Sequence, residues 1–154
     1  MERILVSACL LGSPVRYDGG AKPVADAIWT RWRAEGRLVS VCPEISGGLP
    51  VPRPPAEIVG TRILTDAGDD VTEPFHRGAR QALDTARRWD VRLAVLKEGS
   101  PSCGSGRVYD GTFSGSTVPG RGVTTELLED AGIRVFSEDE LVAAADYLEI
   151  LERG

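Results

Sequence analysis

Short apolar segments alternate with amphipathic segments along this chain, and that alternation restricts its fold more than any other feature. Four segments have the apolar, β-branched character of buried strands: residues 3–8, 38–41, 91–96 and 133–136. Segments with helical spacing of their apolar residues separate these strands or follow the last one. The pattern predicts one α/β domain over residues 1–154, a three-layer, Rossmann-like domain with a mainly parallel sheet.

Caps and apolar faces locate four helices. Proline favours the first turn of a helix and glycine favours its end, so the first helix is expected between Pro23 and Gly36. Ser137 and Glu140 fit a capping box for the last helix. Trp89, in the second helix, and Val142, in the last, are expected on the core faces. The four predicted helices cover residues 23–36, 72–89, 124–132 and 137–151.

Three segments have the composition of irregular structure. Residues 47–55 hold four prolines and two glycines, which indicates an extended connector rather than a central strand. Residues 63–65 and 70–71 flank a turn sequence and predict a small hairpin or turn outside the main sheet. Residues 98–122 contain seven glycines and little periodicity, and a loop of that length in a small domain is usually functional.

Charge and hydropathy exclude several classes of protein. The net charge is -5, which disfavours a phosphate backbone as partner, so we expect no nucleic acid. The longest apolar run is far shorter than a membrane span of ~18 residues, so we expect no membrane partner. Met1-Glu2-Arg3 leads directly into the first predicted strand, so we expect no export signal and a cytoplasmic location.

Three cysteines lie at or beyond the carboxyl ends of predicted strands. Cys9 follows the first strand, Cys42 the second, and Cys103 lies a few residues past the third. Parallel strands place their carboxyl ends at one edge, where open α/β sheets bind ligands, so the fold brings these thiols together. An odd number of cysteines in a reducing compartment disfavours disulfides. Each cysteine alone fits a small buried apolar residue, but the set favours a shared site for zinc, copper(I) or an iron–sulfur centre.

Possible acid–base groups accompany the thiols. Glu44 follows Cys42 and Pro43, and Ser100 and Ser102 precede Cys103. A carboxylate and hydroxyls there fit a base and a proton carrier. Taken singly, Glu44 equally fits a helix cap or a solvated loop acid, and the serines fit turn residues that bond their own backbone. The lone histidine, His76, is assigned no role.

Spaced motifs over nearly the whole chain resemble the thiouracil desulfurase family. The resemblance is carried by residues 6–12 (VSACLLG), 17–19 (YDG), 42–44 (CPE), 47–49 (GGL), 52–57 (PRPPAE), 96–97 (LK), 100–104 (SPSCG) and 109–111 (YDG). Each motif alone is common, but the combination is specific.

The resemblance implies a 4Fe-4S cluster held by Cys9, Cys42 and Cys103, with the fourth iron free to bind the sulfur of a thiocarbonyl substrate. It implies a non-redox reaction in which thiouracil and water give uracil and hydrogen sulfide. Glu44 would activate the water and Ser100 would carry a proton, with Ser102 as second choice for the serine.

Two other functions fit the same cysteines. An iron–sulfur sensor or sulfur-binding module would hold the cluster without turnover, and a zinc-dependent hydrolase would hold zinc in its place. The charge of -5 favours a free thiolated base over a nucleotide, unless Arg16, Arg53 or Arg107 faces the pocket.

Overall fold

A four-stranded parallel sheet forms the centre of the computed structural model, which describes residues 1–21 and 23–154. Its strands lie in the order β2-β1-β5-β8, and Ile4 of β1 lies opposite both Leu38 and Leu93. The predicted fold class is therefore confirmed. The strands are β1 (Ile4–Ser7), β2 (Leu38–Val41), β5 (Leu93–Leu96) and β8 (Arg134–Ser137).

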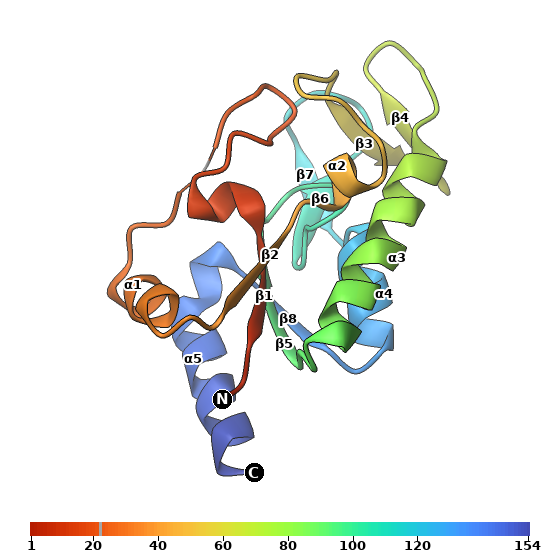
Figure 1. Ribbon diagram of the computed structural model, residues 1–154. Helices are drawn as coiled ribbons and strands as arrows, with labels where there is room; N and C mark the ends of the chain where they lie inside the picture. Colours follow the sequence, from red (N-terminus) through yellow and green to blue (C-terminus); the bar gives the residue numbers. More distant parts are fainter. Residues whose placement is uncertain (22) are drawn as a thin grey trace.

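Helices cover both faces of this sheet (Figure 1). Ile4 and Val6 pack with Trp32 of one helical layer, whereas Leu5 between them packs with Leu83 and Leu128 of the other. This alternation follows from the side-chain period of two along a strand. The first layer contains α1 (Ala27–Ala34) and α5 (Leu141–Arg153), and the second contains α3 (Thr72–Arg88) and α4 (Val123–Asp130).

Three details of the predicted helices are wrong. The first helix begins at Ala27 rather than near Pro23, because the Asp26 carboxylate accepts the Ile28 N–H at 2.8 Å and caps it there. Trp89 lies just past α3, is 45% exposed and has the Arg3 guanidinium over its ring. Val142 is 68% exposed, since it faces away from the sheet. The predicted capping box of Ser137 and Glu140 is present, but it caps the 3₁₀ turn Glu138–Glu140 that leads into α5.

Two antiparallel hairpins lie beyond the carboxyl ends of the sheet (Figure 1). The first joins β3 (Ala56–Val59) to β4 (Arg62–Thr65), a pairing that was not predicted. The small hairpin or turn predicted at residues 63–71 is confirmed as a turn outside the main sheet, closed by an antiparallel Leu64–Asp70 bridge. The second, β6 (Arg107–Tyr109) with β7 (Thr117–Pro119), occupies part of the predicted loop 98–122. The predicted connector 47–55 contains no strand.

A single helical turn, α2 (Pro43–Ser46), was not predicted and rests directly on α3. A methyl group on Gly78 of α3 would overlap the carbonyl oxygen of Pro43, and one on Gly47 would overlap the carbonyl oxygen of Pro74. Glycine at both positions therefore allows the backbones to meet. Within residues 1–21 and 23–154, each helix is too short or too polar to cross a membrane.

Candidate functional site

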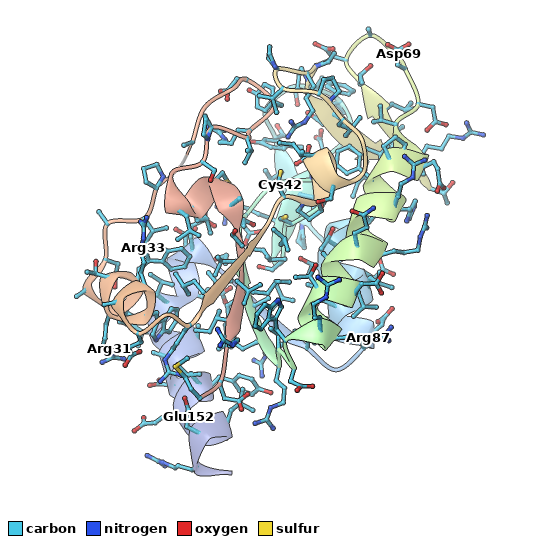
Figure 2. The ribbon with its side chains drawn as sticks, in the orientation of Figure 1. Arg31, Arg33, Cys42, Asp69, Arg87 and Glu152 are labelled. Atoms are coloured by element: carbon cyan, nitrogen blue, oxygen red, sulfur yellow. The ribbon has the colours of Figure 1, made fainter. Side chains whose placement is uncertain are left out.

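The three cysteines line one pocket of about 270 Å³ at the carboxyl edge of the sheet. Cys9 lies in a short 3₁₀ helix after β1, Cys42 is the N-cap of α2 after β2, and Cys103 lies in the loop after β5. Figure 2 shows Cys42 where β2 ends beside α2. All three are free thiols. The strand ends therefore bring together residues that are far apart in the sequence.

Burial disfavours the charged form of each thiol. It raises the pKa of Cys9 to about 11, and the charge of Cys42 adds to the rise. Burial also raises the pKa of Cys103 to about 12, with further increases from Glu44 and Cys9. The pKa of Cys42 is raised for the same first reason. The thiols are close enough to affect one another, and a positively charged group is needed to hold them as thiolates.

The chemistry of the donors indicates which group this site suits. All three thiols line one pocket. Thiolates are soft ligands and are the usual protein ligands of iron–sulfur clusters. In the part of the chain that the structure describes, no three His, Cys, Asp or Glu side chains are arranged around a single metal ion. The donor set therefore fits a cluster.

Glu44 lies in the first turn of α2 and lines the same pocket. Its Oε1 accepts a hydrogen bond from Arg53 Nε at 3.3 Å. Arg53 is itself fixed, because its other nitrogens donate to the carbonyl oxygens of Pro50 and Val15, each at 3.1 Å. Burial raises the pKa of Glu44, and the charge of Arg53 opposes that rise. Glu44 is thus a partly buried carboxyl group beside the thiols, paired with Arg53.

The two predicted serines occupy different places. Ser100 lines the pocket, and its Oγ accepts the N–H groups of Ser102 at 3.0 Å and Cys103 at 3.1 Å. Ser102 is fully buried behind Cys103, and its hydroxyl is bonded to Thr124 Oγ1 at 2.7 Å. The structure therefore brings Ser100, and not Ser102, to the pocket with the cysteines and Glu44.

Positive side chains also line the pocket. Arg16, Arg53 and Lys97 do so, whereas Arg107 is exposed and pairs with Asp139 at 3.7 Å. Lys97 is engaged, because its Nζ donates to the Glu98 carbonyl oxygen and lies 3.1 Å from Glu138. Within the described residues, Arg16 has a long 3.9 Å contact with Asp18 and lies 5.9 Å from the centre of the Tyr17 ring, so it is held less closely than the other two cations.

Two acidic residues of the pocket were not predicted. Glu98 is 8% exposed, and its Oε1 accepts the N–H groups of Gly99, Ser105, Gly106 and Arg107 at 2.9–3.3 Å. Burial acts to raise the pKa of Glu98, but these bonds outweigh it and lower the pKa. Glu57 of β3 is the second. The glycines after Glu98 were the available signal for such an N–H nest, and Glu57 had no local signal.

The fold and the pocket together define an α/β enzyme with a thiol-lined site in the crevice at the carboxyl edge of its sheet. The 2-thiouracil desulfurase family model matches residues 4–140. The YbbK protein of Bacillus subtilis (strain 168) is 45% identical over 148 residues, which cover 90% of this chain and 97% of that protein. The chain belongs to the 2-thiouracil desulfurase family.

A solved structure has the same fold over almost its whole length. It is described as the [4Fe-4S]-dependent thiouracil desulfidase TudS, and it is 53% identical to this chain with a TM-score of 0.95. The match covers 97% of this chain and 99% of that chain. The family resemblance inferred from the motifs is therefore confirmed.

Proposed function

We propose that this chain removes sulfur from thiouracil or a closely related thiolated base by hydrolysis. The observation that carries the proposal is the meeting of three free thiols from three strand ends around one pocket. Membership of the 2-thiouracil desulfurase family and the likeness to a [4Fe-4S]-dependent thiouracil desulfidase supply the chemistry.

Cys9, Cys42 and Cys103 would hold a 4Fe-4S cluster through their thiolates. Bound there, the cluster would supply a Lewis acid for the sulfur of the substrate. Burial raises the pKa of Cys9 and Cys103, so the thiols would release protons when the cluster is loaded.

Glu44 acts as the general base. Its carboxylate takes a proton from the water whose oxygen bonds to the thiocarbonyl carbon, while Arg53 keeps that carboxylate in place. Ser100 carries a proton to the departing sulfur, because its Oγ accepts two N–H bonds and its O–H is free to donate. The carbon–sulfur bond is replaced by a carbon–oxygen bond, and sulfur leaves as hydrogen sulfide with no change in electron count.

The substrate is proposed to be a free base in the cytoplasm rather than part of a nucleic acid. The chain has a net charge of -5, which disfavours a phosphate backbone as part of the substrate. A sensor without turnover and a zinc-dependent hydrolase are less well supported. The family is named 2-thiouracil desulfurase, and the solved structure is a [4Fe-4S]-dependent thiouracil desulfidase.

Separate loss of cluster and turnover tests the assignment. Replacing any one of the three cysteines by alanine is expected to remove bound iron and sulfide release together. Glu44→Gln is expected to keep the visible absorption of the cluster and lose turnover. Glu149→Gln is the control, because it removes one negative charge, as Glu44→Gln does, from an exposed side chain. Loss of iron in Glu44→Gln would make Glu44 a ligand or a structural residue, and a cluster-loaded protein without sulfide release from thiouracil would favour the sensor.

A further inference from the structure

Glu57 is a buried acid in the wall of the pocket opposite the parallel sheet. It lies in β3, where it pairs with Leu64 of β4, and it is the most buried residue of that strand at 8% exposure. It lines the same pocket as the three thiols and Glu44. A buried carboxylate needs a partner, so its contacts indicate what it does.

One oxygen of Glu57 holds the turn after β6. Oε1 accepts the N–H groups of Gly111 at 3.0 Å and Phe113 at 3.1 Å. Gly111 has φ +90°, and a Cβ there would lie 2.7 Å from the carbonyl oxygen of Ile58, so the turn approaches β3 closely. Phe113 has φ 58°, an uncommon value for a residue other than glycine. The turn is therefore shaped around this carboxylate.

The second oxygen has no such partner. In residues 1–21 and 23–154, the hydrogen bonds of the Glu57 carboxylate all involve Oε1. Oε2 has no hydrogen bond among these residues, and it is not fully buried. Since Glu57 lines the pocket, Oε2 is open to the pocket. An ionised carboxylate accepts hydrogen bonds and donates none. The pocket therefore presents a fixed acceptor that the reaction itself does not use.

We propose that Glu57 determines substrate specificity by accepting a ring N–H of the thiolated base at Oε2. This inference rests on the proposed function and names the feature of the substrate that the site reads. Thiouracil carries N–H groups at both ring nitrogens, beside the carbons that bear sulfur or oxygen. Glu44 lies near the thiols, since it is in the first turn of α2 and Cys42 is the N-cap of that helix, whereas Glu57 lies in β3 of the first hairpin. Glu44 therefore acts at the reacting carbon, and Glu57 binds the edge of the ring.

Glu57→Gln tests this with little effect on the wall. The amide oxygen of glutamine accepts the N–H groups of Gly111 and Phe113, and its NH₂ then replaces Oε2. A donor would face the ring N–H in place of an acceptor. Equilibrium dialysis with labelled uracil, which has the same N–H groups and no sulfur to lose, measures binding without turnover. Uracil is compared with 1-methyluracil and 3-methyluracil on cluster-loaded protein.

We expect Glu57→Gln to weaken uracil binding by about tenfold or more, the usual effect of losing a hydrogen bond to a charged group. The wild-type protein should bind one of the two methyl derivatives poorly, and Glu57→Gln should change that derivative's binding by less than about twofold. Sulfide release from thiouracil should show the same loss in kcat/KM, mainly through KM. Glu149→Gln, which is exposed and far from the pocket, is the control and should leave each value unchanged.

Equal effects of Glu57→Gln on all three ligands, or wild-type protein that binds uracil no better than the variant, would overturn the proposal. Wild-type protein that shows the N–H preference in dialysis but releases no sulfide from thiouracil would contradict the proposed function and leave the role of Glu57 standing. If Glu57→Gln does not fold, the wild-type protein decides alone, because equal binding of uracil and both methyl derivatives refutes an N–H contact.

Discussion

Gly78→Ala is expected to separate α2 from α3 and so displace the turn that carries Glu44. In a helix interior, alanine is favoured over glycine by about 1 kcal/mol, so propensity alone predicts a more stable protein. The added methyl group, however, would overlap the backbone carbonyl of Pro43, which cannot rotate away as a side chain can. Overpacking of this kind typically costs about 1–3 kcal/mol and shifts the backbone. Because a real Cβ essentially never lies within 3.0 Å of such an atom, the two backbones must move apart.

The two terms together predict a net loss of up to about 2 kcal/mol in the free energy of unfolding. For a chain of 154 residues, that loss lowers Tm by up to about 8 °C. The effect on activity is larger, since a 1 Å displacement of a catalytic group reduces the rate by about a hundredfold. Thermal unfolding followed by circular dichroism and sulfide release at matched cluster content measure the two effects.

Asp84→Ala is the matched control for this substitution. Asp84 is exposed on α3, so its replacement adds helix propensity without any overlap, and it should leave sulfide release unchanged. A Gly78→Ala protein that melts at a higher temperature and keeps full activity would show that α2 does not depend on this contact.

Three further predictions concern the pocket walls. Glu98→Gln should lower the free energy of unfolding near neutral pH, because the folded pKa of Glu98 is lowered. The difference from the wild-type protein should disappear as the pH falls through the folded pKa, and urea denaturation between about pH 7 and pH 3 measures it. Ser100→Ala should reduce kcat at matched cluster content, whereas Ser102→Ala should reduce stability by about 1–3 kcal/mol and leave kcat unchanged. Arg16→Gln should leave kcat/KM for free thiouracil within about twofold, and a wild-type preference for the thiouracil nucleotide that Arg16→Gln abolishes would contradict a free-base substrate.

The central sheet was predictable because its signals are local. Each strand is a short apolar run that is followed closely by a residue that ends a strand, such as Pro43 after β2. The parallel topology then places Cys9, Cys42 and Cys103 at one edge of the sheet. The same reasoning placed Glu44 and Ser100 near the thiols. Convergence of the thiols followed from the order of the strands and needed no knowledge of side-chain contacts.

The walls of the pocket were not predictable because their partners are distant in the sequence. β3 follows a proline-rich connector, and its pairing with β4 outweighs the weaker strand signal of Ala56–Val59. Glu57 and the N–H groups that it holds are 54 and 56 residues apart. Ser102 was indistinguishable from Ser100 by pattern, and only the position of Thr124 in α4 decides which serine is buried.

Three carboxylates share the pocket with three thiols, and their bonding limits the repulsion among them. Glu44 is paired with Arg53, Glu57 holds two backbone N–H groups, and Glu98 holds four. Backbone N–H groups carry partial positive charge that the fold holds in place, so these acids are compensated where they stand. Donors also reach two of the thiols, since the N–H groups of Ile45 and Glu44 act on Cys42 and the hydroxyls of Ser7 and Ser102 act on Cys103, but burial outweighs them and raises the pKa of each thiol. Negative charge on all three sulfurs would therefore be favoured by a cationic centre bound between the cysteines, which is the condition that a metal cluster would meet.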